Sequence, residues 1–331
     1  MLGLGSFRFL LAFCVAISHL YADMIHGPAA YAVWGFFVLS GFLMTLILNE
    51  NYGNSVSGLK AYAQNRFLRI FPQYLLACLI GLITFAVAAK LKTDVTQLNP
   101  EARIPTGTSD IFANLLLNPV WTPTSGRLVP VSGALATEVG AYLLFPLFFR
   151  SITAVLAVMA VSFFASFERG FHCDTFAIRY TAMSTCMLAF GFGALMYHLK
   201  DRLAMFQAPM YSTLCWILHC LIWLFFPYYP WEAGLYVSVI LSGWVVISLF
   251  PLKVGALDRM LGDLTYPFYL LHTTVGVWIL ISWKDAFGLR SLPFALISMA
   301  TTIAVSIVII IYFDRPIMKL KKKPRADVPH N

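Results

Sequence analysis

The chain has 331 residues, of which 60% are apolar and only 11% are charged, and its mean hydropathy is +0.77. These values exclude a soluble globular domain of this length and indicate a polytopic membrane protein. The net charge of +8 does not require a nucleic-acid partner, because basic loops beside anionic lipid headgroups account for it. Of six cysteines, only Cys173 falls in an expected loop, so we predict neither a disulfide framework nor a metal site.

Several apolar segments are long enough, at about 20 residues each, to cross the hydrocarbon core of a bilayer. The first is expected to be retained as a helix, because no basic residue precedes its apolar run as in a signal peptide. Little more than Arg150 separates the fourth segment from the fifth, and Pro146 is expected to bend or end the fourth. We therefore predict an all-α, polytopic membrane helix bundle of about ten transmembrane helices, at residues 4–22, 29–48, 72–90, 131–149, 151–167, 178–197, 210–227, 233–250, 264–283 and 292–313.

The predicted orientation comes from the basic cluster KLKKKPR that follows the last segment. The positive-inside rule and an even number of spans make both termini cytoplasmic. We expect one membrane domain at residues 1–318 and a basic cytoplasmic tail at 319–331. Aromatic residues such as Trp34 and Tyr228 are expected in belts at the membrane–water interfaces.

The longest polar stretch, residues 91–130, is expected outside the cytoplasm. Loops of this length without strong helical periodicity are often functional. This one either caps a binding cleft or serves as a tether.

Two ionisable residues, Arg8 and His19, lie within the first apolar segment, FRFLLAFCVAISHL. Eleven residues make about three helical turns, so both side chains share one face, about 16 Å apart along the axis. Ionisable groups at membrane depth are costly and usually mark a site or pathway. We expect this face to line a cavity. The alternative is an arginine that snorkels to the headgroups, with the histidine at the opposite interface.

A second polar cluster, LKAYAQNRFLRIFPQY, precedes the third segment. Arg66 and Arg69 are three residues apart and share a helix face. Flanking apolar residues, with Pro72 opening the next helix, predict a short amphipathic helix in the cytoplasmic interface. Guanidinium groups bind phosphate oxygens bidentately, so this pair would suit a nucleotide-bearing cofactor such as coenzyme A. Pairing with lipid phosphates is the alternative.

Together these motifs resemble the acyltransferase 3 family of integral-membrane carbohydrate O-acyltransferases. The resemblance rests on Arg8 and His19 in the first segment, FFVLSGF in the second, RFLR before the third and LGDLTYPFYLLH near the ninth. It implies that His19 is the essential histidine of the family and Arg8 its partner. It also implies that Arg66 and Arg69 lie near the entrance for acyl-CoA.

The fourth segment, GALATEVGAYLLFP, is similar to the family pattern with Glu138 and Tyr142 aligned. Gly133 and Ala134 replace the usual Trp and Ser, and Val139 stands where many members have a second acidic residue. These departures weaken the assignment of substrate contacts in this helix. Glu138 remains a candidate for binding the acceptor hydroxyls, since carboxylates in a membrane span are usually functional.

Acyl transfer to a hydroxyl needs a base, and neutral imidazole suits this task near pH 7. We expect His19 to act as general base in a direct transfer. Asp23, one turn further, could orient the imidazole or could be an interfacial cap. Ser40 in LSGF could be a nucleophile, but a Ser-Gly pair also favours close helix packing. A structural hydrogen bond across helices is the expectation for His272.

The expected protein is a bacterial inner (plasma) membrane O-acyltransferase that moves an acyl group, with acetyl expected, from cytoplasmic acyl-CoA to a hydroxyl of a cell-surface or periplasmic glycan. A lipid-linked saccharide is another acceptor of this class. Membrane lipids are expected partners, together with an oligomeric or extracytoplasmic protein partner; nucleic acid and metal are not. The rival hypotheses are a transporter or flippase, in which Arg8, His19 and Glu138 relay protons, and a noncatalytic scaffold.

Overall fold

The computed structural model describes residues 2–21, 28–120, 123–283, 286 and 288–322. Regular structure in these residues is helical, apart from one isolated bridge between Ala102 and Arg127. The all-α membrane bundle is thus confirmed, whereas the count of ten spans and the sides of the termini remain predictions. Five helical stretches are long and apolar enough to cross a membrane: Ala29–Tyr52 (α2 with a π-helical end), Val56–Lys90 (α3), Ile152–Arg169 (α6), Ala256–Ser282 (α11) and Leu292–Met318 (α12 to α13).

Shorter helices complete the bundle. The break between α5 and α6 falls where the sequence predicts it: α5 ends two residues after Pro146, and Ser151 Oγ caps α6 by accepting from Ala154 N at 3.2 Å. The shorter helices are α1 (Leu4–Leu20), α4 (Thr108–Leu116), α5 (Ser132–Phe148), α7 (Phe176–Tyr180), α8 (Met183–His198), α9 (Pro209–Leu221) and α10 (Ala233–Leu249).

The predicted amphipathic helix before the third span is wrong as a separate element, because α3 runs without a break through Pro72. A proline inside a helix costs about 3 kcal/mol, so tertiary contacts must offset it. Such contacts lie on both sides of the proline. Tyr266 Oη donates to Ile70 O at 2.9 Å, and the fully buried Tyr74 donates to Asn114 O at 2.7 Å.

The interfacial position expected for Trp34 is also wrong. Its side chain is fully buried, its ring packs edge-on against Tyr236, and Nε1 donates to Tyr180 O at 3.1 Å. An indole can leave the interface when its N–H finds a partner inside the protein. Trp34 therefore connects α2 with α7 and α10 and is part of the core.

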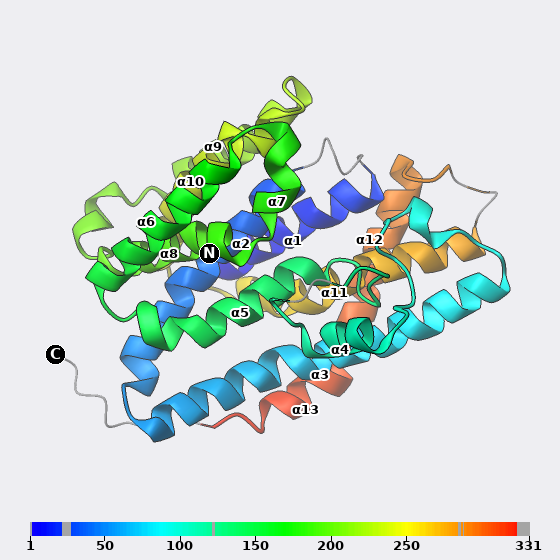
Figure 1. Ribbon diagram of the computed structural model, residues 1–331, viewed down its shortest axis with the longest axis horizontal. Helices are drawn as coiled ribbons and strands as arrows, with labels where there is room; N and C mark the ends of the chain where they lie inside the picture. The colour runs from blue at the N-terminus through cyan, green and yellow to red at the C-terminus, as the bar shows by residue number, and fades with distance from the viewer. Residues whose placement is uncertain (1, 22–27, 121–122, 284–285, 287, 323–331) are drawn as a thin grey trace.

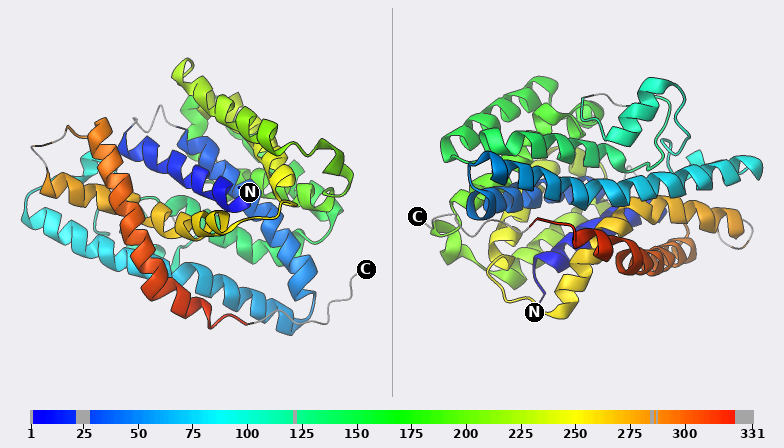
Figure 2. Two further views of the ribbon diagram at one scale, coloured as in Figure 1. Left: turned by 180° about the vertical axis from the view of Figure 1, so that it is seen from behind. Right: turned by 90° about the horizontal axis from the view of Figure 1, so that it is seen from below.

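Helix α1 lies at the centre of the bundle, between α2 and α11, and α12 crosses α11 (Figures 1 and 2). Asp258 of α11 caps the start of α1: its Oδ1 accepts from Gly3 N at 2.6 Å, Ser6 N at 2.7 Å and Ser6 Oγ at 2.6 Å. At the other end of α1, His19 contacts His272 of α11. The two helices therefore run parallel, as expected if the first and ninth segments cross in the same direction.

Helices α2 and α8 approach closely through glycines, as expected for the LSGF segment. A Cβ added to Gly41 would lie 2.0 Å from the carbonyl oxygen of Phe190, and one on Gly193 would lie 1.9 Å from that of Val38. Neither backbone can move without separating the helices. The small residues thus set the distance between α2 and α8.

We predict that Gly193→Ala lowers the free energy of unfolding by about 1–3 kcal/mol, because the new methyl group overpacks the α2–α8 contact. The matched control is Gly133→Ala in α5, where an added Cβ would meet nothing nearer than the Arg127 guanidinium at 3.7 Å. Thermal unfolding of both purified variants in detergent checks this. Equal midpoints for the two variants would contradict it.

Candidate functional site

One end of the bundle contains a cavity of about 300 Å³, here named the arginine cavity. Helix α1 contributes Arg8 and α3 contributes Arg66 and Arg69, so the three arginines of the sequence analysis converge on it. Lys321 of the tail adds a fourth basic side chain, and Glu138 and Asp263 are the acidic side chains that line this cavity. This end of the bundle is therefore rich in positive charge.

Few carboxylates neutralise these arginines. Arg69 forms a long ion pair of 3.8 Å with Asp314, whose Oδ1 also accepts from Gln73. Arg66 Nη1 approaches the Met44 sulfur at 3.4 Å, and the buried Nε atoms of Arg8 and Arg66 have no partner. Among the described residues, neither Arg8 nor Arg66 has a carboxylate within ion-pair distance. The arrangement suits an anion with several oxygens.

Lys321 is a member of the cavity that the sequence analysis missed. The Asn65 side chain holds the tail in place: Nδ2 donates to Lys322 O at 2.9 Å, and Oδ1 accepts from Lys322 N at 3.0 Å. Burial, with Arg69 and Arg66 nearby, lowers the pKa of Lys321 to about 8. A lysine with this pKa is partly neutral just above physiological pH and gains a proton when an anion binds.

A narrow cavity of about 70 Å³, the middle cavity, adjoins the first. Its walls are mostly apolar, with Phe36 and Phe37 among them, and Glu138 and Arg8 at one side. The Glu138 carboxylate accepts hydrogen bonds from Ser40 Oγ and Tyr142 Oη. Ser40 is thus bound to a carboxylate and lies away from His19, which disfavours its role as a nucleophile activated by that histidine.

The opposite end of the bundle holds a cavity of about 410 Å³, the histidine cavity, where His19 is 6% exposed. Asn99 and Glu101 line it from the long polar stretch, and Phe176, Tyr180, Trp231 and Tyr269 add aromatic surface. A mixture of polar groups and aromatic faces is typical of small-ligand pockets. The polar stretch 91–130 therefore borders this cavity, in agreement with the capping alternative.

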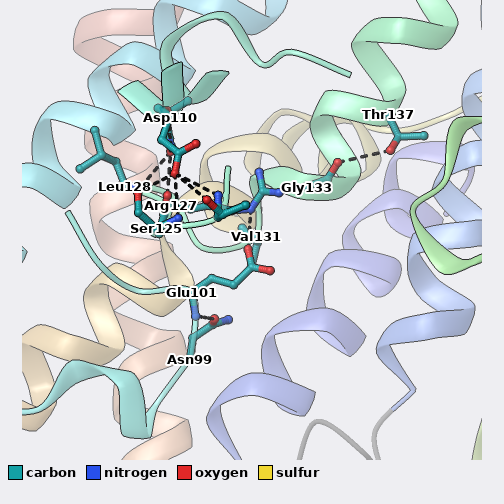
Figure 3. A network of polar contacts seen from close by, with 12 residues as sticks. Asn99, Glu101, Asp110, Ser125, Arg127, Leu128, Val131, Gly133 and Thr137 are labelled. Atoms are coloured by element: carbon teal, nitrogen blue, oxygen red, sulfur yellow. Dashed lines mark hydrogen bonds and ion pairs between the residues drawn. The ribbon is translucent and has the colours of Figure 1, made fainter. Parts of the chain in front are cut away.

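A polar network holds the long stretch in place (Figure 3). Arg127 is 9% exposed and pairs through Nε with Glu101 Oε2 at 2.5 Å, while Asn99 Oδ1 accepts from Glu101 N at 2.9 Å. Asp110 accepts from Ser125 N at 2.8 Å and from Ser125 Oγ at 2.6 Å. These contacts link separate parts of the long stretch and place Glu101 at the wall of the histidine cavity.

The three cavities lie in series. Arg8, Arg69 and Glu138 line both the arginine cavity and the middle cavity. Val33, Ala134 and Tyr269 line both the middle cavity and the histidine cavity. The Arg8 and His19 face of α1 therefore borders the row at both ends, as the eleven-residue spacing predicts.

Asp23 lies outside the described residues. His272, expected to have a structural role, is fully buried on α11, and its Nε2 lies 2.8 Å from His19 Nδ1. The sequence shows this histidine within YPFYLLH, but 253 residues of separation conceal the contact. Among the described residues, no three His, Cys, Asp or Glu side chains gather as a metal site would require.

A family model described as an acyltransferase domain matches residues 2–311, which is nearly the whole chain. The match includes α1, α2, α5 and α11, the helices that line all three cavities. No curated protein sequence and no solved structure matches the chain.

We predict that Arg127→Gln speeds amide hydrogen exchange in residues 99–107 and 124–130 about tenfold, because it removes the nearly buried guanidinium that pairs with Glu101 and links the two segments. Lys200→Gln is the control, since it breaks a pair of 3.5 Å with 29% and 42% exposed side chains, which contributes little. Exchange followed by mass spectrometry checks both variants. Unchanged exchange in Arg127→Gln would contradict the proposed restraint.

Proposed function

The chain belongs to the acyltransferase 3 family, and we propose that it moves an acyl group, with acetyl expected, from cytoplasmic acyl-CoA to a glycan hydroxyl on the other side of the bacterial inner membrane. The family match and the apolar helices support a multi-pass membrane acyltransferase.

The row of cavities is the observation that carries this proposal. Arg8 and His19 are about 16 Å apart along α1, since eleven residues rise 1.5 Å each. The pantetheine arm of coenzyme A spans roughly 15 Å, about four to five residues of extended chain. A donor with its phosphates in the arginine cavity could therefore extend its thioester through the apolar middle cavity to His19. In this arrangement the acyl group needs no separate step that transports it across the membrane.

The donor end fits coenzyme A by charge. The phosphates of coenzyme A would replace the carboxylate partners that Arg8 and Arg66 lack. Asn65 keeps Lys321 at the same cavity. The apolar walls at Phe36 and Phe37 would exclude water from the arm.

The acceptor end fits a saccharide. Trp231 and Phe176 offer aromatic faces, and Asn99 and Glu101 offer hydrogen-bonding groups to ring hydroxyls. An acceptor hydroxyl placed beside His19 loses its proton to the imidazole as its oxygen attacks the thioester carbonyl. The C–S bond then breaks, and the imidazolium returns the proton to the departing thiolate.

In this proposal Glu138 belongs to the donor side and not to the acceptor. It lies at the arginine and middle cavities with Ser40 and Tyr142, whereas the acceptor cavity is lined by other residues. We assign it to the passage of the donor arm, where its charge offsets part of that of Arg8. A transporter would also need a passage, but family membership favours the enzyme.

The first experiment is acetyl-CoA binding to purified protein in lipid nanodiscs. Arg66→Ala with Arg69→Ala should weaken binding at least about 100-fold, because each charge-assisted contact contributes about 1.5 kcal/mol. His19→Ala should bind within about twofold of wild type, since it acts only on the reacting end. Calorimetric titration measures both.

The matched control is Arg259→Ala with Arg315→Ala, two exposed arginines that line a different cavity. This variant removes the same charge and should keep wild-type affinity. If folded wild type binds neither acetyl-CoA nor longer acyl-CoAs, the donor assignment fails and the transporter hypothesis becomes the leading one.

Binding should also depend on pH through Lys321, whose pKa is lowered to about 8 by burial and by Arg69 and Arg66. Above that pH the amine is neutral, so affinity should fall between pH 7 and pH 9. The donor phosphates are already ionised over this range, with a second pKa near 6.

Lys321→Gln should bind about 3–10-fold more weakly at pH 7 and show no such decline, because one charge contact is absent at every pH. Lys200→Gln, at a lysine that lines none of the three cavities, should keep the wild-type profile. The dissociation constant of acetyl-CoA at pH 7, 8 and 9 decides. The same decline in Lys321→Gln would show that another group titrates.

A further inference from the structure

The contact between His19 and His272 joins the two histidines edge to edge. His19 Nδ1 and His272 Nε2 are 2.8 Å apart, the ring planes differ by 13°, and the ring centroids are 5.1 Å apart. A centroid separation this large with nitrogens this close requires rings that lie nearly in one plane. The geometry is that of an N–H···N hydrogen bond.

The direction of this hydrogen bond follows from a second contact, which the other ring nitrogen of His272 makes. His272 Nδ1 lies 2.8 Å from the Tyr269 carbonyl oxygen. A carbonyl oxygen only accepts, so His272 Nδ1 carries a proton. In neutral His272 the other nitrogen, Nε2, then holds a lone pair. His19 must therefore donate from Nδ1, and its own lone pair is left on Nε2.

This tautomer is the one that acyl transfer needs. His19 lines the histidine cavity, and because Nδ1 is bound to His272, Nε2 is the nitrogen left to face an acceptor. Imidazole in water prefers the proton on Nε2, which would block that position. The hydrogen bond made by one ring nitrogen decides which tautomer the other shows.

Other ionisable groups surround the pair. Tyr180, Tyr269 and Glu101 line the same cavity, and Glu101 is paired with Arg127. Arg290 is near enough for its positive charge to influence His19. Its Nη2 donates to Leu98 O at 3.0 Å. No carboxylate forms an ion pair with either histidine in the described part of the chain. Among these groups, the neutral ring of His272 is the one that binds His19 Nδ1.

We propose that His272 is a positioning residue that holds His19 in the Nδ1–H tautomer, with the Tyr269 carbonyl fixing the tautomer of His272 in turn. This inference rests on the proposed role of His19 as base. In the reaction the acceptor O–H bond breaks and its proton moves to His19 Nε2, while the new C–O bond forms. His272 Nε2 keeps accepting from Nδ1, which orients the imidazolium until it protonates the thiolate released by C–S cleavage.

A spectroscopic test needs neither donor nor acceptor. Solid-state NMR of ¹⁵N-histidine protein in lipid should show His19 with a protonated Nδ1 and an unprotonated Nε2; His19→Gln assigns the signals. In His272→Leu the proton of His19 should move to Nε2. Wild-type His19 with its proton on Nε2 would overturn the inference, even if acyl transfer itself were observed.

A kinetic test uses transfer of labelled acetyl from acetyl-CoA to the glycans of membranes that contain the protein. His272→Leu should lower kcat roughly 10²–10⁴-fold with an unchanged KM for acetyl-CoA, because the base shows the wrong tautomer. His272→Gln should recover most of the rate, since its amide oxygen can accept from Nδ1. His272→Glu should move the acidic limb of the pH profile to higher pH, because a carboxylate favours the imidazolium.

The control for damage to the fold is His219→Leu, which removes another buried histidine whose Nε2 binds a backbone oxygen, that of Gly234 at 3.1 Å. It lines none of the three cavities. A folded His272→Leu protein with the wild-type rate would overturn the inference, as would equal losses in the Leu and Gln variants. If wild-type membranes transfer no acyl group, the proposed function fails, and the NMR experiment still decides the tautomer.

Discussion

The attachment of α1 to α11 is the constraint on which the site depends. Ionisable and unpaired polar groups are costly away from water, so each must find a partner inside the bundle. Asp258 provides partners for the free N–H groups at the start of α1, and His272 provides one for His19 near its end. One helix thus holds the other at two points about four turns apart. The orientation of the Arg8 and His19 face follows from this attachment.

That orientation divides the chemistry between the two ends of the bundle. The basic side chains with few carboxylate partners gather at the end where α1 begins, and the polar and aromatic surface gathers where α1 ends. The narrow middle cavity joins them, with Glu138 as its acidic group. In the proposed function, a charged donor and a glycan acceptor would bind in these separate environments, with their reacting atoms meeting at His19.

Local sequence patterns predicted which segments form helices better than they predicted where each helix begins and ends. The apolar segments became helices, and Arg150 lies in the break between α5 and α6. Pro72 indicated a helix start, because its backbone lacks the N–H that an interior helix residue donates. In the structure α3 is continuous through Pro72, where Ile70 and Tyr74 make hydrogen bonds to distant residues. Tryptophan is a residue type common at membrane interfaces, but Trp34 is buried in the core, where the carbonyl oxygen of a residue 146 positions away accepts its indole N–H.

The sequence by itself determined the membrane class, the helical bundle, the shared face of Arg8 and His19 and the pairing of Arg66 with Arg69, because composition and helical periodicity are local properties. Only the tertiary structure decided that Ser40 binds Glu138, that Lys321 joins the arginines and that His272 meets His19. The Ser40–Glu138 and His19–His272 contacts join residues 98 and 253 positions apart. Their geometry depends on how whole helices pack, which no short stretch of sequence encodes.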